Sequence, residues 1–367
     1  MAGLLPDSDN MELRDGDKIL LIRFSALGDM VHVLPALRLL RESRPGVEIH
    51  WLTEDRFARM IENHPDLNGT YVFRRKEISS MWVNPLRWPT AARTVSATIR
   101  DIRKAGFDWV IDFQGNAKSA MFVRASGIRS RIGFARGFCR ELNYLSSNTH
   151  VRPPGGRIHR IERNLSLLGP LGIQPNYMPP RFAAWEGDAE SVGRAWAELA
   201  GGSPSVVMMH PGTSAFGAFK RWPAERFGAL AERLKADFGA AILVSHGPGE
   251  DDIAATVARI SRGAARPLPH GTSLTALAEW LSRCSLFVGC DTGPMHIAAG
   301  LGIPVVAIFG PKDPVIYGPY GTKSKVVNCG AKCAPCDKRE CDDPYCMTDI
   351  AIDDVYAACA ALLAKQD

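Results

Sequence analysis

Chemically versatile side chains gather in four short segments of this 367-residue chain. Each segment combines small residues with acidic, basic, hydroxyl or histidine side chains: Ser25–Asp29 (SALGD), His210–Pro223 (HPGTSAFGAFKRWP), His246–Asp251 (HGPGED) and Gly289–His296 (GCDTGPMH). Small residues allow backbone N–H groups to approach a phosphate, and a lysine in the same loop adds a positive charge. These segments are therefore the candidates for binding and catalysis.

The segment Ser25–Asp29 offers a carboxylate at the start of an expected helix. Gly28 permits a tight turn, and Asp29 stands where the helix begins. As a structural residue, Asp29 would cap the helix, a role worth about 1 kcal/mol, and the loop taken alone favours this reading. As a functional residue, it would accept a proton as a general base. The G-x-G-x-x-G pattern is absent from this loop, which disfavours a nicotinamide-dependent dehydrogenase.

The segment His210–Pro223 suits a phosphate. Thr213 and Ser214 follow an apolar run, and Lys220 adds the charge. Pro223 suits the first position of the next helix, so an ordinary turn and helix start explains that part equally well. The phosphate-binding reading also accounts for the lack of acidic side chains before Lys220.

Two further segments supply acceptors for hydroxyl groups. Glu250 follows an apolar run and is placed to accept hydrogen bonds from both hydroxyls of a ribose. Thr292 and Gly293 open a helix whose free backbone donors suit an anion. Asp291 would repel a diphosphate, so it fits better as an acceptor for sugar hydroxyls or as a cap. His296 fits either this site or a buried structural role, which is the commoner fate of a lone histidine.

The elements that position these segments alternate along the chain. Short apolar runs separate amphipathic stretches, which is typical of βαβ units and a parallel sheet. The pattern breaks near 171–188 and then restarts. The sequence predicts an α/β protein with two Rossmann-like domains, divided into a tail (1–17), a first domain (18–184), a second domain (185–350) and a C-terminal helix (351–367). Loops at the carboxyl ends of parallel strands share one edge, so the last three segments predict a nucleotide-sugar pocket.

Charge is unevenly distributed. Residues 1–184 contain 27 lysines and arginines against 18 acidic residues, and the rest of the chain is acidic. The basic half is either a solvated surface or the site of an anionic partner, such as a phosphorylated substrate or acidic lipid head groups. Nucleic acid is disfavoured because no binding-module signature is present. No apolar stretch reaches the roughly 18 residues of a spanning helix, and the charged start is unlike a signal peptide, so we expect a cytoplasmic protein.

Five of the nine cysteines crowd into one segment, CGAKCAPCDKRECDDPYC. Its members Cys333, Cys336, Cys341 and Cys346 could ligate a structural metal with thiolates, although the spacing is not the paired C-x2-C form. Free thiols are the alternative, because a protein without a secretion signal keeps its cysteines reduced.

Taken together, the four segments resemble glycosyltransferase family 9, the ADP-heptose:lipopolysaccharide heptosyltransferases. The resemblance runs from about Lys18 to about Pro319. It implies a B-type glycosyltransferase fold with two domains facing across a cleft, and a final helix that crosses back to the first domain. It also implies an inverting transfer of heptose from ADP-heptose to the anionic inner core of lipopolysaccharide, without a metal or other cofactor. The enzyme would work at the cytoplasmic face of the inner membrane, in peripheral contact with it.

The resemblance also assigns roles to residues. Asp29 corresponds to the family's base, with Ser25 and Gly28 in the same acceptor-side loop, and Lys220 corresponds to its phosphate-binding lysine. The other donor-binding positions correspond to Thr213, Ser214, Glu250, Asp291, Thr292, Gly293 and His296. Asp251 and Asp252 stand beside Glu250, so the register of that acid stays open.

Two alternatives remain at this level. One is a related glycosyltransferase with another nucleotide sugar or acceptor. The other is a catalytically inactive protein that binds a nucleotide sugar. The presence of both Asp29 and Lys220 argues against the second, because an inactive relative has no need to retain both.

Overall fold

The chain folds into two compact units, Met1–Ala183 and Ala184–Asp367. The computed structural model describes residues 12–82, 87–183, 186–336, 338 and 340–364. The boundary expected between 184 and 185, residues 1–11 of the expected tail and residues 365–367 of the expected last helix lie outside the described residues.

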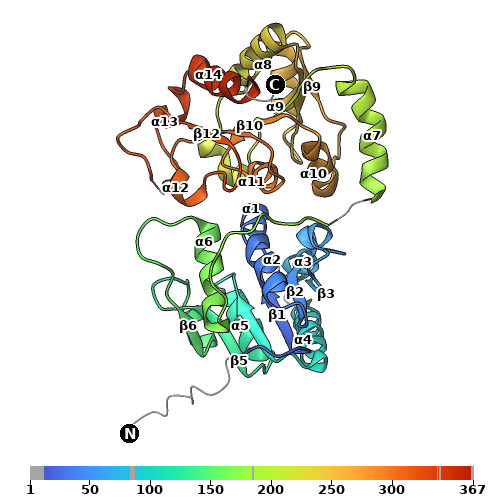
Figure 1. Cartoon of the computed structure of the whole chain (residues 1–367), viewed down its shortest axis with the longest axis vertical. Coiled ribbons are helices and arrows are strands. Elements are labelled where there is room, and N and C mark those ends of the chain that lie inside the picture. Colours follow the sequence, from blue (N-terminus) through green and yellow to red (C-terminus); the bar gives the residue numbers. More distant parts are fainter. Residues whose placement is uncertain (1–11, 83–86, 184–185, 337, 339, 365–367) are drawn as a thin grey trace. The chain divides into compact units, whose positions relative to one another are not determined.

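The first unit is built on a parallel six-stranded sheet (Figure 1) with the strand order β3-β2-β1-β4-β5-β6. Its strands are β1 (Lys18–Ile22), β2 (Glu48–Glu54), β3 (Gly69–Phe73), β4 (Trp109–Asp112), β5 (Ser130–Phe134) and β6 (Thr149–Val151). The order reverses direction between β1 and β4, which is the point where ligands bind in open parallel sheets.

Helices and short 3-10 turns connect these strands. They are α1 (Leu27–Val31), α2 (Leu34–Ser43), η1 (Asp55–Met60), α3 (Arg75–Trp82), α4 (Trp88–Ala105), α5 (Ala117–Ala125), η3 (Asn143–Ser146), α6 (Arg160–Leu165) and η4 (Ser166–Leu171). Alternate β1 residues Leu20 and Ile22 pack in one cluster with Ile102 of α4 and Phe122 of α5. Because successive strand side chains point to opposite faces, the same strand can be covered on both sides.

The second unit repeats this topology, with the parallel strand order β12-β11-β10-β7-β8-β9. Its strands are β7 (Val206–His210), β8 (Ala241–Val244), β9 (Ala265–Pro267), β10 (Leu286–Cys290), β11 (Val305–Ile308) and β12 (Ser324–Val327). Its helices are α7 (Glu186–Ala200), η5 (Ala215–Lys220), α8 (Ala224–Phe238), α9 (Asp251–Ile260), α10 (Leu274–Ser282), α11 (Gly293–Gly300), α12 (Pro314–Tyr317), α13 (Tyr345–Thr348) and α14 (Ile352–Leu363).

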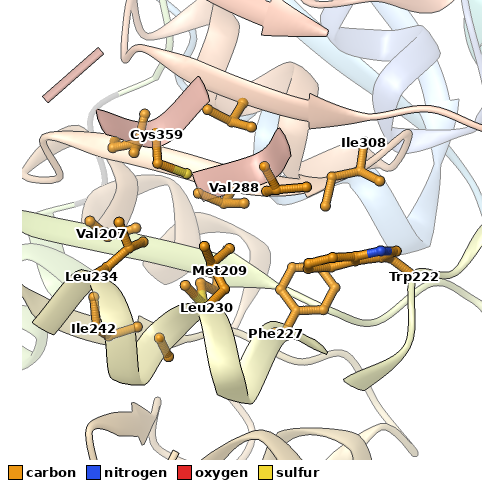
Figure 2. Packing of buried hydrophobic residues seen from close by; sticks show 14 of the residues in the cluster. Val207, Met209, Trp222, Phe227, Leu230, Leu234, Ile242, Val288, Ile308 and Cys359 are labelled. Atoms are coloured by element: carbon orange, nitrogen blue, oxygen red, sulfur yellow. The ribbon is translucent and has the colours of Figure 1, made fainter. Parts of the chain in front are cut away.

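One face of the second sheet carries a large apolar core (Figure 2). Alternate strand residues such as Val207, Met209 and Val288 pack against Leu230 and Leu234 of α8. A fully buried tryptophan, Trp222, closes one end of this core and donates its indole N–H to the Ile350 carbonyl oxygen at 3.1 Å. Burying the indole with its donor satisfied fixes the segment that follows Lys220.

The C-terminal helix α14 belongs to this core. Val355, Cys359, Leu362 and Leu363 are buried in it, and α14 packs against α8, β10, β11 and β12. The sequence reasoning expected the last helix (351–367) to cross back to the first unit; over Ile352–Leu363 its buried apolar residues pack in the core of the second unit. In the described part of the chain, no helix is both long and apolar enough to traverse a membrane.

Candidate active site

The candidate loops that begin at His210, His246 and Gly289 follow neighbouring strands of the second sheet. β7 lies between β10 and β8, so the loops after these strands meet at the point where the strand order reverses. The sequence reasoning placed these loops on successive strands of one half, and the topology brings them to one edge.

Lys220 and Asp291 form the charged centre of this edge. Lys220 Nζ lies 2.7 Å from Asp291 Oδ2, and His296 Nε2 lies 3.5 Å from Asp291 Oδ1. Burial alone would raise the pKa of Asp291, but the hydrogen bond from His296 and the charge of Lys220 outweigh it and lower that pKa. Asp291 thus contacts Lys220 through one oxygen and His296 through the other, an arrangement that holds both side chains in place.

The small residues expected around a phosphate come from the loops that follow β7 and β10. Thr213 is buried, and its Oγ1 has no hydrogen-bond partner among the described residues. Ser214 is exposed at the start of η5. Thr292 is the N-cap residue of α11 and Gly293 its first residue, but the Thr292 side chain makes no capping bond. A buried hydroxyl and uncapped helix amides are free donors suited to an anion.

The Glu250 side chain packs against Gly212, in the loop that contains Thr213. A Cβ atom at position 212 would overlap the Glu250 carboxylate, so only glycine allows the two loops to approach. Glu250 Oε2 accepts the Gly247 N–H at 2.7 Å. Asp251 instead pairs with His270 at 2.7 Å, and Asp252 is exposed on α9. Of the three acids whose register the sequence left open, Glu250 is the one packed against the phosphate-loop segment.

His210 was named by the sequence only as the start of its loop. It is buried at the end of β7, and its Nδ1 lies 2.9 Å from Ser245 Oγ. Burial lowers the pKa of His210 to about 4, against the attraction of Glu250. The imidazole is therefore neutral near pH 7 and ties the β7 and β8 loops together.

Asp29 occupies the corresponding edge of the first unit. It is the third residue of α1, whose N-cap is Ala26, so it is not itself the N-cap residue. Its Oδ2 accepts the Ala26 N–H at 3.4 Å and lies 2.5 Å from Arg23 Nη2. The side chain remains 37% exposed, so a solvent-facing carboxylate coexists with the local structural bond.

Arg23 and Gln114 position this loop, and sequence reasoning missed both. Arg23 also donates to the Phe113 carbonyl oxygen at 2.7 Å, which joins the β1 and β4 loops. Gln114 Oε1 accepts the Phe24 N–H at 3.0 Å. The only sequence signal was their position, since each stands within two residues of the end of a buried strand.

Two buried acids organise the rest of this edge. Asp112 accepts the backbone N–H groups of Gln114 and Gly115 and the side chains of Ser119 and Asn143. Burial raises the pKa of Asp112, although those bonds oppose the shift.

Glu54 ends β2 at 1% exposure of its side chain and is bound by Lys118 and, at 3.2 Å, by Arg75. Both cations belong to the basic half that the sequence linked to an anionic partner.

The cysteines of the C-terminal segment form no disulfide bonds. Burial raises the pKa of the Cys346 thiol to about 11, and the neighbouring Cys333 and Cys336 contribute to the rise. Across the described ranges, no group of three or more His, Cys, Asp and Glu side chains is arranged to hold a metal ion.

Comparison with known proteins places this arrangement in a family. The model of glycosyltransferase family 9 (heptosyltransferase) matches residues 95–346. The chain is 30% identical over 329 residues to lipopolysaccharide heptosyltransferase 1 of Pseudomonas aeruginosa, covering 88% of this chain and 87% of that protein.

Two solved structures share the fold. One is the family 9 glycosyl transferase of Veillonella parvula, with a TM-score of 0.82, 21% identity and coverage of 97% and 100% of the two chains. The other is the E. coli heptosyltransferase WaaC with ADP, with a TM-score of 0.71, 23% identity and coverage of 95% and 100%. The chain thus has the B-type glycosyltransferase fold and belongs to glycosyltransferase family 9, as its motifs indicated.

Proposed function

We propose that this protein transfers L-glycero-D-manno-heptose from ADP-heptose to the inner core of lipopolysaccharide. The observation that carries the proposal is the Lys220–Asp291 pair beside the start of α11, in a chain that belongs to family 9. The relative from P. aeruginosa is named for lipopolysaccharide heptose transfer, and the WaaC structure contains ADP.

The proposed donor contacts follow from the second unit. Lys220, the Thr213 hydroxyl and the backbone amides at Thr292 and Gly293 bind the diphosphate. Glu250 accepts hydrogen bonds from the ribose hydroxyls. Asp291 keeps the lysine in place, because a lysine held by a buried carboxylate loses little entropy when a phosphate binds.

In the proposed reaction, Asp29 accepts the proton of an acceptor hydroxyl as the oxygen attacks the anomeric carbon of the heptose. The bond from that carbon to the β-phosphate oxygen breaks, and ADP leaves with the bonding electrons, which inverts the anomeric centre. Lys220 and the α11 amides stabilise the charge that develops on the diphosphate. Because these donors supply positive potential, we propose that the reaction requires no metal ion or other cofactor.

We also propose that the enzyme works in the cytoplasm, at the cytoplasmic face of the inner membrane. The acceptor's carboxylates and phosphates are anionic, and the first 184 residues carry an excess of nine positive charges.

A donor screen tests the proposed activity. Purified protein receives a lipopolysaccharide acceptor with ADP-heptose, with UDP-sugars or with NAD, and release of free nucleotide is measured. We expect release only with ADP-heptose, and a loss of about 100-fold or more in the Lys220→Gln variant. Release from a UDP-sugar would favour the related-transferase alternative. Tight ADP-heptose binding without release would mean that the protein is an inactive binder.

A further inference from the structure

The helix that carries the proposed base is short. α1 has five residues, and Asp29 is the third of them. A single turn has few hydrogen bonds of its own, so its direction depends on what it packs against. At the amino end of α1, the Asp29 carboxylate is held by the Ala26 N–H and by Arg23. The carboxyl end must be held as well if Asp29 is to keep one position.

His32 follows the last residue of α1 and is fixed by two contacts to a distant segment. Its carbonyl oxygen accepts a hydrogen bond from Asn164 Nδ2 at 3.0 Å, across 132 positions of sequence. Its ring packs edge-on against the His159 ring, with the ring centroids 5.3 Å apart and the planes at 78°. All three residues are buried, so both contacts lie in the interior of the first unit.

The partner segment is itself firmly held. His159 is the N-cap residue of α6, and its Nδ1 accepts the Ile161 N–H at 3.1 Å. An Nδ1 that accepts a hydrogen bond carries no proton, so the ring is oriented by the helix that it caps. Ile161 and Leu165 are buried residues of α6, and this helix packs against α2. The first turn of α6 is therefore a fixed support for the end of α1.

We propose that His159 and Asn164 are positioning residues for Asp29. They act through α1, because both contact the residue that ends it. The inference rests on the proposed role of Asp29 as the base. A general base must lie within hydrogen-bond reach of the acceptor hydroxyl, and a displacement of about 1 Å caused by a distant change can lower the rate by about 100-fold.

A purely structural role for the two residues makes a different prediction. Packed rings and a buried hydrogen bond stabilise a fold, so their loss would lower the melting temperature without changing the turnover number of the folded protein. Because His159 is both a packing ring and a helix cap, substitutions at this position can separate the two roles.

Two substitutions of His159 have opposite expected effects. His159→Asn removes the ring but keeps an acceptor for the Ile161 N–H, because asparagine is a good N-cap residue. Its turnover number should fall by about tenfold, with an unchanged KM for ADP-heptose. His159→Phe keeps a ring against His32 but loses the acceptor, so it should lose thermal stability and keep its turnover number within about twofold of the wild type. Steady-state kinetics and thermal denaturation measure these quantities.

His50 supplies a matched control. Its ring packs edge-on against Phe107 in the same unit, with centroids 5.2 Å apart and planes at 76°. His50 lies within β2, so its ring contact does not involve α1 or α6. His50→Asn removes a contact of the same geometry and should keep the wild-type turnover number. Equal turnover numbers for His50→Asn and His159→Asn would overturn the proposal.

A double-mutant cycle tests whether His159 acts through Asp29. In the Asp29→Asn background, His159→Asn should lower the remaining turnover number by less than about twofold, because the carboxylate that His159 positions is absent. If the two effects multiplied instead, His159 would act independently of Asp29 and the proposal would be wrong.

A second measurement needs no heptose transfer. The carbon-13 signal of the Asp29 carboxyl group, identified by its loss in Asp29→Asn, should shift in His159→Asn and not in His50→Asn. An unchanged signal in His159→Asn would contradict the positioning role. Full activity of Asp29→Asn would instead remove Asp29 as the base, and the carbon-13 signal would still report whether His159 positions its carboxylate.

Discussion

Both units place carboxylates at the carboxyl ends of parallel strands, but these carboxylates have different surroundings. The side chain of Asp291 is 10% exposed, and its two oxygens face Lys220 and His296. The side chain of Asp29 is 37% exposed, and within the described residues both of its contacts fall on Oδ2. A buried carboxylate that faces a cation through one oxygen and a histidine through the other is suited to positioning those groups, whereas an exposed carboxylate is better suited to accept a proton from a ligand. The same topology is therefore compatible with the proposed base in one unit and with a carboxylate that holds a lysine in the other.

The largest expected effect comes from removing the charge of Asp29. Asp29→Asn keeps the size and the bond to the Ala26 N–H but cannot accept the proton. The turnover number should fall by roughly 10²–10⁴, the usual value of general base catalysis. The KM for ADP-heptose should change little, because the proposed donor contacts belong to the second unit. Steady-state kinetics with saturating acceptor measure both quantities.

Asp55→Asn is the matched control for this prediction. Asp55 is another acid after a strand of the first unit, and its carboxylate accepts backbone N–H groups of Arg56 and Lys76. Its variant should retain wild-type turnover. If Asp29→Asn were as active as Asp55→Asn, Asp29 would have only a structural role and the comparison between the units would fail.

A smaller and graded effect is expected at Lys220 and Asp291. Lys220→Gln removes the cation itself, so kcat/KM for the donor should fall by about 10²–10³. Asp291→Asn keeps Lys220 but removes the carboxylate charge that holds it. We therefore expect kcat/KM for the donor to fall by about tenfold, mostly through a higher KM. Measuring the turnover number at saturating donor distinguishes the two variants, because only Lys220→Gln should lower it strongly. An Asp291 variant as impaired as Asp29→Asn would instead assign Asp291 a direct part in the reaction.

The smallest effect concerns stability and pH. The folded pKa of His210 is about 4, below the value of about 6.5 for an unfolded histidine. Folding therefore favours the neutral ring, and stability is lost as pH falls through this window. Between pH 7 and pH 5 this site should cost about 2 kcal/mol in free energy of unfolding. Urea unfolding of wild type and His210→Gln checks this, since the variant should show a shallower pH dependence. If the free energy of unfolding changed equally with pH in the wild type and the variant, a group other than His210 would take up the proton.

Much of the fold could be predicted because the central strands are buried on both faces. The runs ILLI and VVMM are apolar throughout, and the structure places them in β1 and β7. The edge strands β6, β9 and β12 leave little signal in the sequence, because each has only three or four residues and some of them are exposed. A short edge strand forms through pairing with its neighbour, which sequence periodicity does not register.

Part of the site could also be predicted from the sequence. Loops with small residues after a strand led to Thr213, Lys220 and Asp291, because local chemistry makes such loops distinctive. Arg23, Glu54 and Gln114 were missed, since their roles depend on groups that are distant in sequence. Glu54 and Lys118, for example, are 64 positions apart. The sequence also left Asp291 as an acceptor for sugar hydroxyls or a cap, and only the fold brings Lys220 to it.

The contiguity of the two units affects how the protein is made on the ribosome. All strands of the first sheet lie before residue 184, so that unit is complete before synthesis of the second begins. Domains that emerge first generally fold first, at roughly 5–20 residues added per second. The second unit must wait, because α14 contributes buried residues to its core and is translated after all of that unit's strands. An incomplete chain would therefore present a folded first half and an uncovered apolar sheet face, which makes the second half the part that needs chaperone protection.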